Sequence, residues 1–361
     1  MCAKAIIKEE ATSIVKTFDS DLKELSNLLN EAFLKDYGKG KFFEFSQEYL
    51  EWLISNPAIN PEFVIGAYNK KNNRLIGFQM AIPMKFSIGP NKLYSLVCTF
   101  LATHPDFRKQ RIGYRVIKEN YLRALNNNVD FLFNFQLKPV MDWYKNPKQG
   151  VFEYKKYQLI GKILFLPDIK AIKNKYWLMG LFFKLWSFTY KPFYLLRFSP
   201  HYSVRRGKLK DFEMCFNILR EIQKTKPKIW DRNELKHQLF SNFTHSYLLL
   251  DRHNRIVAIL NLYFLNLFGF PKNKVGIIDF FECKIDLGNG VKSYFLLRIE
   301  QILERHNVTA LIKYASSQRE AKPFLNSGFV AHPSKKFILY YKNLSNKFSI
   351  GDLEGIEISL R

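Results

Sequence analysis

The stretch Phe100-Leu-Ala-Thr-His-Pro-Asp-Phe-Arg-Lys-Gln-Arg-Ile-Gly113 decides how the first half of this chain folds. It overlaps the end of an apolar run, residues 94–103, that predicts a buried strand, and it leads into residues 114–125, whose apolar side chains recur at helical spacing. A helix opened by a short loop presents unpaired N–H groups and the positive end of its dipole. Because the loop is basic and Gly113 allows close backbone approach, the stretch predicts a pyrophosphate site.

Strands and helices alternate on both sides of this stretch. The expected elements are helices near residues 22–33 and 49–53, a hairpin of 63–68 with 74–82, and strands at 130–135 and 150–152. After Tyr202 a similar order restarts. The expected elements there are a strand at 203–206, a helix at 210–224, a hairpin of 246–250 with 256–262, a strand at 274–283, a helix at 292–306, and strands at 308–314 and 337–342.

The restart predicts two copies of one α/β (α+β) unit, each a mixed, mostly antiparallel sheet flanked by helices. We expect an N-terminal domain over residues 1–165 and a C-terminal domain over 202–361. Residues 166–201 are aromatic and basic and contain three prolines, which is typical of a linker. The second half has no equivalent of the basic loop, so we do not expect it to bind a second ligand of the same kind.

The chain has 361 residues and a formal net charge of +24, which calls for an anionic partner. Nucleic acid, an anionic membrane and a polyphosphate ligand would each suit. The basic residues are spread along the chain and no helix-turn-helix, RNP or zinc motif is present, so no dedicated nucleic-acid binding is expected. No apolar run is long enough for a transmembrane segment, although the basic aromatic residues 176–188 would allow peripheral membrane contact.

The four cysteines, Cys2, Cys98, Cys215 and Cys283, lie far apart and form no CxxC pair. This spacing predicts no metal site and no disulfide scaffold. Together with the lack of a signal-peptide pattern, it indicates a cytoplasmic protein.

The loop resembles the acyl-coenzyme A loop of the GNAT superfamily of acyltransferases, in which Arg or Gln is followed two residues later by Gly and then by Gly or Ala. In this chain Arg111 takes the place of the first glycine. That departure is similar to the loop of eukaryotic N-myristoyltransferases, and the resemblance covers residues 25–119. Further matching motifs are Leu25-x-x-Leu28-Leu29-Asn30-Glu31, Phe43-Glu44-Phe45-Ser46, Trp52-Leu53 with Pro57 and Pro61, Leu75-Ile76-Gly77-Phe78, and Ala81-Ile82-Pro83.

The resemblance implies two tandem GNAT-fold domains and an enzyme that transfers an acyl group from acyl-CoA, myristoyl-CoA or acetyl-CoA, to an amine, preferably a protein N-terminus. It implies that the backbone N–H groups of Phe100 and Leu101 form an oxyanion hole, and that the carboxylate of Arg361 acts as the base. The residues implied in acyl-CoA binding are Ala102, Thr103, Arg108, Lys109, Gln110, Arg111, Ile112, Gly113 and Tyr114.

Two alternatives stay open. A GNAT N-acetyltransferase acting on a small amine, an aminosugar or a lysine would use Tyr144 as general acid and a polar residue such as Asn134 on the neighbouring strand. A non-catalytic basic binding module on a degenerate GNAT fold would not bind coenzyme A at all. The basic segment 33–41, where the family has an acidic loop, favours an acceptor less basic than the family's usual peptides.

Overall fold

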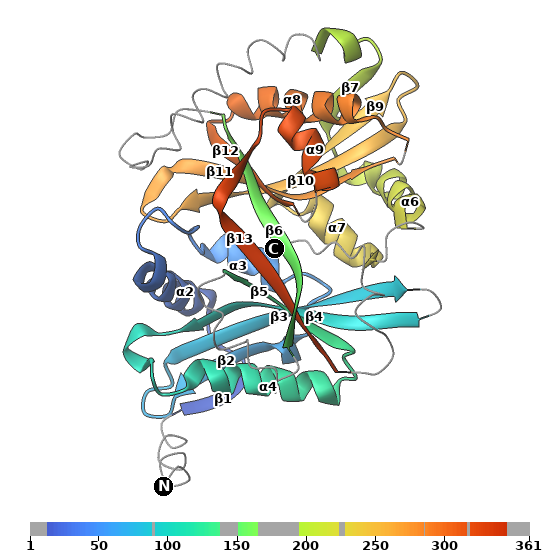
Figure 1. Ribbon diagram of the computed structural model, residues 1–361. Helices are drawn as coiled ribbons and strands as arrows, with labels where there is room; N and C mark the ends of the chain where they lie inside the picture. The colour runs from blue at the N-terminus through green and yellow to red at the C-terminus, as the bar shows by residue number, and fades with distance from the viewer. Residues whose placement is uncertain are drawn as a thin grey trace. The chain divides into compact units, whose positions relative to one another are not determined.

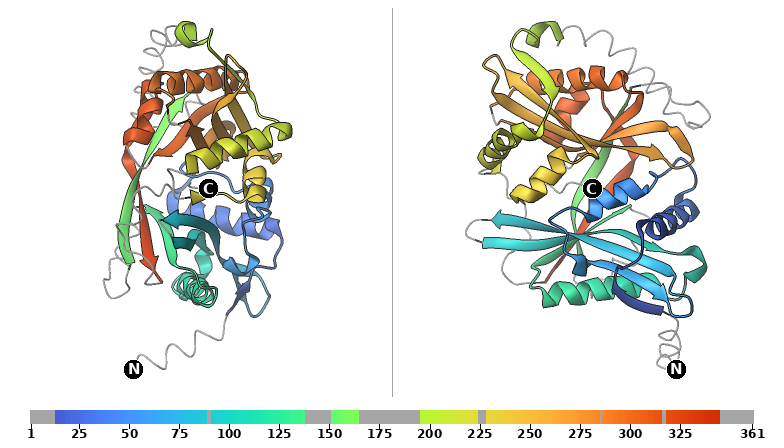
Figure 2. Two further views of the ribbon diagram at one scale, coloured as in Figure 1. Left: turned by 90° about the vertical axis from the view of Figure 1, so that its right-hand side faces the viewer. Right: turned by 180° about the vertical axis from the view of Figure 1, so that it is seen from behind.

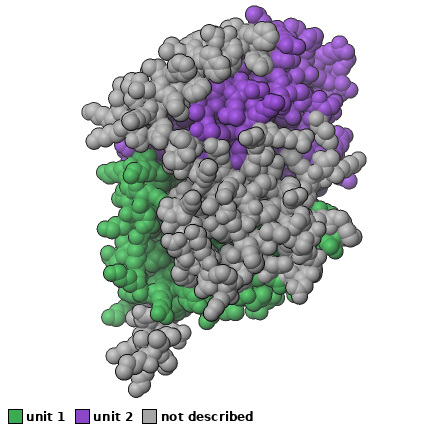
Figure 3. Space-filling model, in the orientation of Figure 1, with its two compact units in different colours: residues 1–136, 141–154, 339–353 green, residues 137–140, 155–338, 354–361 purple. Residues whose placement is uncertain are grey.

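The computed structural model describes residues 13–88, 91–137, 151–164, 195–223, 228–284, 286–315 and 318–344. The chain divides into two compact units, shown in different colours in Figure 3. Of the described residues, 13–136, 151–154 and 339–344 belong to unit 1. Residues 155–164 and 195–338, apart from the gaps, belong to unit 2.

Unit 1 contains a sheet in which strands follow each other in sequence order (Figure 1). The strands are β1 (Ser13–Thr17), β2 (Val64–Asn69), β3 (Leu75–Ile88), β4 (Asn91–Thr103) and β5 (Phe131–Leu137). The pairings of β1 with β2, β2 with β3 and β3 with β4 are antiparallel, whereas β4 and β5 are parallel. The parallel pair is possible because a helix connects the two strands.

The helices of unit 1 are α2 (Leu22–Tyr37), α3 (Gln47–Ile54) and α4 (Ile112–Asn126). Figures 1 and 2 show α4 along one face of the sheet and α2 with α3 on the other. Asp21 caps α2 by accepting from the Glu24 N–H, and Ser46 caps α3 by accepting from the Tyr49 N–H. On α4, Ile112 and Val116 pack against Ile65, Ala67 and Ile76 of the sheet.

Unit 2 contains a sheet in the order β6, β12, β11, β10, β9, β7. These strands are β6 (Val151–Ile163), β7 (Tyr202–Arg206), β9 (Thr244–Asp251), β10 (Ile256–Leu267), β11 (Phe270–Cys283) and β12 (Val308–Ala315). Its helices are α6 (Phe212–Gln223), α7 (Arg232–Phe240), α8 (Asn289–Glu304) and α9 (Gln318–Asn326). As in unit 1, a parallel pair, β11 with β12, is joined through a helix, here α8.

Two apolar clusters cover the two faces of the unit 2 sheet. One joins Leu249, Leu260 and Leu262 to the inner side of α8, including Phe295 and Leu303. The other joins the opposite face of the strands to α6 and α7. Its members include Cys215, Leu219, Leu235, Leu239, Leu248, Ile259 and Phe280. Each unit is therefore a sheet covered by helices on both faces, with its own core.

The predicted fold class is confirmed, since both units are mixed, mostly antiparallel sheets flanked by helices. Helix α7 and the strands β1 and β8 (Lys228–Ile229) were not among the expected elements. The expected domain boundaries at 165 and 202 differ from the grouping in the structure, which places residues 155–164 in unit 2 and 339–344 in unit 1. The reason is that β6 and β13 (Val330–Asn343) are long strands whose two ends belong to different units.

Unit 2 contains an ion pair that is removed from solvent. The Lys162 ammonium group lies 2.8 Å from a Glu300 carboxylate oxygen, each side chain is only 4% exposed, and the ammonium also donates to the Ser327 carbonyl at 2.6 Å. We expect Lys162→Met to lower the free energy of unfolding by about 3–5 kcal/mol, because it leaves a buried carboxylate without its cation.

The double variant Lys162→Met/Glu300→Leu tests the cause, since it removes both charges. Urea unfolding should show that the double variant recovers most of the lost stability. Equal losses in the single and double variants would contradict an electrostatic origin.

Candidate functional site

The register between β3 and β4 changes at the end of β4. Phe78 pairs with Ala102 and Met80 pairs with Thr99, so Phe100 and Leu101 together lie opposite the single residue Gln79. This is a β-bulge, in which the extra residue leaves the ladder of backbone hydrogen bonds. The bulge thus takes Phe100 and Leu101 of an interior strand out of the regular register.

The parallel pairing of β4 with β5 ends just before the bulge. It runs from Ser95 opposite Phe131 to Cys98 opposite Asn134, and within the two described strands it does not continue over their last residues. Asn134, expected as a polar residue on the neighbouring strand, is thus the last β5 residue paired with β4. The bulge follows this last pair by two residues.

Phe100 adopts a backbone conformation that is rare for a bulky residue, with a φ of 54°. Its ring packs edge-on against Phe45 at 5.6 Å and Tyr49 at 6.3 Å between centroids. These rings belong to a larger aromatic cluster on α2, α3 and the segment between them. The cluster also contains Phe33, Tyr37, Phe42 and Trp52. Aromatic packing therefore stabilises a backbone conformation that on its own costs about 1–3 kcal/mol.

The loop after β4 turns sharply into α4. Residues Pro105–Phe107 form a single 3-10 turn, and Lys109 and Arg111 both have left-handed backbone conformations, with φ of 71° and 57°. The first intrahelical bond of α4 runs from the Arg115 N–H to the Arg111 carbonyl. The N–H groups of residues 112–114 lie ahead of this bond in the first turn of the helix. Arg111 stands at the N-cap, and a guanidinium offers no acceptor atom to cap them.

The start of α4 lies close to the sheet because of a glycine on β3. A Cβ atom at Gly77 would come within 2.5 Å of the Ile112 side chain. The first turn of the helix therefore lies beside the end of β4. There, a Cβ atom added at Gly113 would lie 3.3 Å from the Thr103 hydroxyl oxygen. The bulge and the uncapped helix start therefore lie at the same end of β4.

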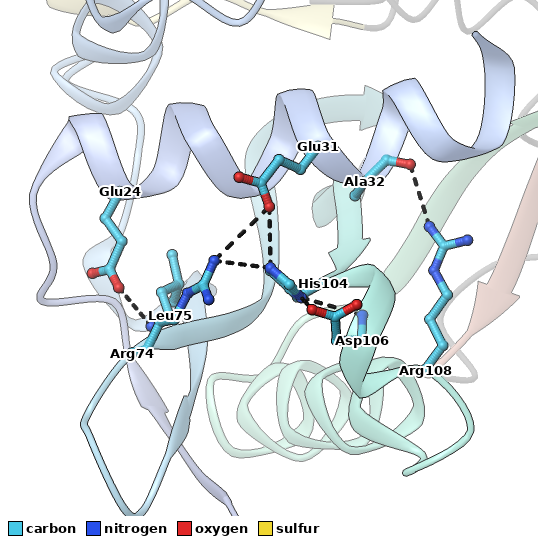
Figure 4. Close-up of polar contacts among 8 residues, drawn as sticks. All are labelled: Glu24, Glu31, Ala32, Arg74, Leu75, His104, Asp106 and Arg108. Atoms are coloured by element: carbon cyan, nitrogen blue, oxygen red, sulfur yellow. Dashed lines mark hydrogen bonds and ion pairs between the residues drawn. The ribbon is translucent and has the colours of Figure 1, made fainter.

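Arg108 contacts the protein itself, although we expected it among the ligand-binding residues. Its guanidinium donates two hydrogen bonds to Asp36, at 2.6 and 3.1 Å. It donates a third to the Ala32 carbonyl at 3.2 Å (Figure 4). Both partners belong to the last turns of α2. Arg108 thus fastens the basic loop to α2.

His104 also connects this loop to α2. It is 5% exposed, its Nε2 lies 3.0 Å from Glu31, and its Nδ1 accepts from the Asp106 N–H at 3.2 Å (Figure 4). Arg74, at the start of β3, lies beside both groups. Because both ring nitrogens are used within the loop and α2, the geometry gives His104 a structural role.

A buried amide pair lies under the bulge. Asn120 of α4 donates to the Gln79 side-chain oxygen at 3.0 Å, and both residues are 2% exposed. The carbonyl oxygen of Asn120 has no hydrogen-bond partner among the described residues. Sequence reasoning did not single out this pair, although a glutamine inside an apolar strand and an asparagine on the buried face of a helix were signals for it.

Unit 2 repeats part of this geometry without the basic loop. The parallel pairing of β11 with β12 ends at Ile277 opposite Ile312, and Asp279 is the extra residue of a bulge two positions further on. The following helix α8 begins after Gly288, and the connecting residues contain no arginine. The expectation that the second half lacks an equivalent loop is consistent with this arrangement.

Several predicted site residues stay predictions. Tyr144 and Arg361 lie outside the described residues, as do residues 176–188. The structure brings Phe100, Leu101 and the loop residues 102–114 together at one end of β4, but it holds no ligand that would test their roles. In the described part of the chain, no cluster of three or more His, Cys, Asp or Glu could hold a metal. Within the same ranges, no helix is long and apolar enough to cross a membrane.

A parallel strand pair that ends before a bulge, and a helix that begins behind a basic loop, are the features that the resemblance to the GNAT superfamily led us to expect. Comparison with known proteins points to one family within this superfamily. Residues 8–134 match the family model described as "Myristoyl-CoA:protein N-myristoyltransferase, N-terminal domain". The resemblance predicted for residues 25–119 is therefore confirmed.

Curated relatives support the same resemblance over a limited region. A glycylpeptide N-tetradecanoyltransferase of Kluyveromyces lactis is 31% identical over 101 residues, which are 28% of this chain and 23% of the relative. The enzyme of that name from Drosophila melanogaster is 32% identical over 100 residues, 28% of this chain and 21% of the relative. The matched region thus spans about a quarter of the length of these relatives.

Solved structures extend the likeness in fold to nearly the whole chain. A crystal structure of Saccharomyces cerevisiae N-myristoyltransferase with bound myristoyl-CoA aligns with a TM-score of 0.68 at 14% identity, over 92% of this chain and 79% of that one. Another, with bound myristoyl-CoA and inhibitors, aligns with a TM-score of 0.69 at 15% identity, over 96% and 87%. The chain has the tandem GNAT fold of the N-myristoyltransferases.

The close approach of α4 to the sheet gives a stability prediction. We expect Gly77→Ala to lower the free energy of unfolding by about 1–3 kcal/mol, because the new methyl group overlaps the branched methyl of Ile112. Urea unfolding measures the loss, and amide hydrogen exchange locates it in the first turn of α4.

A second substitution serves as the matched control. Ile112→Leu keeps the side-chain volume but moves the branch away from the backbone, so Gly77→Ala/Ile112→Leu should regain part of the stability. A loss below about 0.5 kcal/mol in the single variant would show that the helix does not pack this tightly.

Proposed function

We propose that this protein is an acyl-CoA-dependent N-acyltransferase of the N-myristoyltransferase type. It transfers an acyl group from acyl-CoA to an amine, preferably the N-terminus of a protein, by direct attack in a ternary complex. The observation that carries the proposal is the bulge at Phe100 and Leu101, two residues beyond the last parallel pair and directly ahead of the basic loop.

The bulge supports an oxyanion hole. Peptide N–H groups that are not used in the sheet can donate to an oxygen that becomes negative when an amine attacks a thioester. The aromatic cluster around Phe100 fixes the direction of these groups before substrate binds, and preorganised donors stabilise a transition state because they need no rearrangement.

The loop and α4 support binding of the coenzyme A phosphates. The N–H groups of residues 112–114 and the positive end of the helix dipole suit a pyrophosphate, and the exposed Lys109 and Arg111 add positive charge beside them. We assign the remaining loop residues Ala102, Thr103, Gln110 and Tyr114 to the lining of this site. Arg108 acts through the loop, because its guanidinium is engaged with α2.

The acyl chain length and the acceptor are the finer parts of the proposal. The structural neighbours are described with bound myristoyl-CoA, which favours a long-chain donor over acetyl-CoA. We retain the carboxylate of Arg361 as the base for the acceptor amine and Tyr144 as the general acid of the acetyltransferase alternative. The free cysteines 98, 215 and 283 support a cytoplasmic location.

Calorimetric titration with myristoyl-, palmitoyl- and acetyl-CoA tests donor binding. We expect tight binding of myristoyl-CoA and a loss of about 1.5–3 kcal/mol in Arg111→Ala, equivalent to roughly 10–150-fold in Kd, because a charge-assisted phosphate contact is removed. Arg108→Ala should weaken binding less, and Asp36→Asn should reproduce its effect, because both variants break the contact between the loop and α2.

The outcome decides among the three functions. Binding of acetyl-CoA alone would favour the acetyltransferase. If no donor binds, and Arg111→Ala changes nothing, the protein is a basic binding module rather than an enzyme.

Leu101→Pro tests the oxyanion hole, because proline has no N–H to donate. We expect kcat for acyl transfer to fall about 10²–10³-fold, the usual effect of losing one such donor, while the Kd for acyl-CoA changes little. Single-turnover kinetics measure the chemical step. Leu101→Ala keeps the N–H and removes a side chain that is 38% exposed, so it should retain activity; equal losses in both variants would rule out a backbone donor.

A further inference from the structure

Unit 2 carries a row of basic side chains that the proposed acyl transfer does not use. The row consists of Arg206 on β7, His245 on β9, Lys274 on β11, and His306 just after α8. We call these four residues the basic row. Arg206, Lys274 and His306 are exposed, and His245 is half-buried.

The strand register places the row on one face of the sheet. Arg206 pairs with Tyr247, two residues from His245 on β9. Leu262 pairs with His245, and Phe264, two residues further along β10, pairs with Gly276, two residues from Lys274. Because paired residues share a face and side chains alternate, Arg206, His245, Phe264 and Lys274 point to the same side.

His306 joins the row from the helix that covers this face. Val308, at the start of β12, pairs with Lys274, and His306 lies two residues before it. The α8 side chains Phe295, Ile299 and Leu303 pack on the same side of the strands as Tyr247 and Leu262. The basic row thus borders the C-terminal end of α8, which Figure 1 shows lying across the strands of unit 2.

Phe264 holds the centre of the row in place. Its ring contacts the His245 ring at 4.7 Å between centroids, and the Lys274 ammonium lies 4.7 Å from the same centroid. One imidazole and one ammonium group thus contact a single ring. The packing on Phe264 orders these two groups of the row, although Lys274 is exposed.

The charges that act on His245 are all positive. Burial, and then Arg206, Lys274 and His306, lower the pKa of His245 to about 4. The charged groups nearest in sequence on the end of α8 are Glu304 and Arg305, one of each sign. Arg206 also acts on Tyr247, the residue paired with it. Clustering like charges in this way opposes folding, so a bound anion would stabilise the surface.

Unit 2 has a bulge at Asp279 and a connection to α8 that resemble parts of the candidate site of unit 1. The basic row lies at the opposite end of β11 from these two features. Lys274 is near the start of that strand, whereas the Asp279 bulge and the connection to α8 are near its end. The row also spans four adjacent strands, or about 14 Å at the usual strand spacing. A single phosphate is too small to contact all of it.

We propose that the basic row is a docking surface for an extended acidic segment of a partner protein. In an extended chain, side chains on one face recur about every 6.8 Å, so carboxylates two residues apart can reach neighbouring cations of the row. Single-stranded nucleic acid fits less well, because it needs open aromatic faces for base stacking, and the Phe264 ring is in contact with His245 and Lys274.

Fluorescence anisotropy with the full chain tests the proposal. The probe is a labelled oligoaspartate peptide, and a labelled oligouridylate of equal charge represents the nucleic-acid alternative. Arg206→Gln/Lys274→Gln should weaken oligoaspartate binding by about tenfold or more at physiological ionic strength. The matched control Lys210→Gln/Lys236→Gln removes the same charge from exposed positions of unit 2, and it should bind like the unaltered protein.

Equal weakening in the two variants would overturn the proposal, because it would show attraction to net charge alone. Tighter binding of oligouridylate than of oligoaspartate, lost in the row variant, would also overturn it in favour of nucleic acid. NMR titration of the His245 ring gives an independent result: a bound carboxylate should raise the pKa of His245, and an unchanged pKa with oligoaspartate bound would contradict docking on the row.

Discussion

The proposed function places two conflicting demands on the same backbone groups of unit 1. A β-sheet is stable because its N–H and C=O groups pair, whereas an oxyanion hole needs N–H groups that the sheet does not use. The bulge at Phe100 and Leu101 resolves the conflict locally, since it takes two residues out of register while β3 and β4 remain paired before and after it. The unfavourable backbone conformation of Phe100 is offset by the rings of Phe45, just before α3, and Tyr49 on α3.

Helix α2 has a role that its position in the chain does not suggest. Three of its carboxylates bind separate parts of the site: Glu24 accepts from the Leu75 N–H at 2.7 Å, Glu31 contacts His104, and Asp36 contacts Arg108. Figure 4 shows the contacts of Glu24, Glu31 and the Ala32 carbonyl following one another along the helix. These carboxylates of α2 offset part of the positive charge of the basic loop, and they do so where the loop turns into α4. The individual ion pairs are partly exposed and each contributes little, but together they fix the loop from several sides.

Sequence patterns predicted most of this architecture because the relevant signals are local. The apolar run before the loop and the helical spacing after it define β4 and α4 to within a few residues. The motif Arg108-x-x-Arg111-x-Gly113 located the basic loop that leads into α4, and its binding of phosphate stays a prediction. The bulge, in contrast, depends on the register between two strands, and periodicity within one strand does not reveal it. The role of Arg108 was also hidden, because Asp36 lies more than seventy residues away and both a phosphate and a carboxylate are suitable partners for arginine.

The last described strand has a consequence for how the protein is made. Residues 339–344 count with unit 1, the Leu344 N–H donates to the Asp130 carbonyl at 2.8 Å, and the Leu344 side chain packs on a cluster with Phe63 and Leu96. During synthesis these residues leave the ribosome some two hundred residues after the rest of unit 1. The N-terminal unit therefore cannot reach its final form until residues 339–344 have been made. Folding of unit 1 can be completed only after residues 155–338 of unit 2 have been translated. The folding of the two units is therefore linked, although each has its own core.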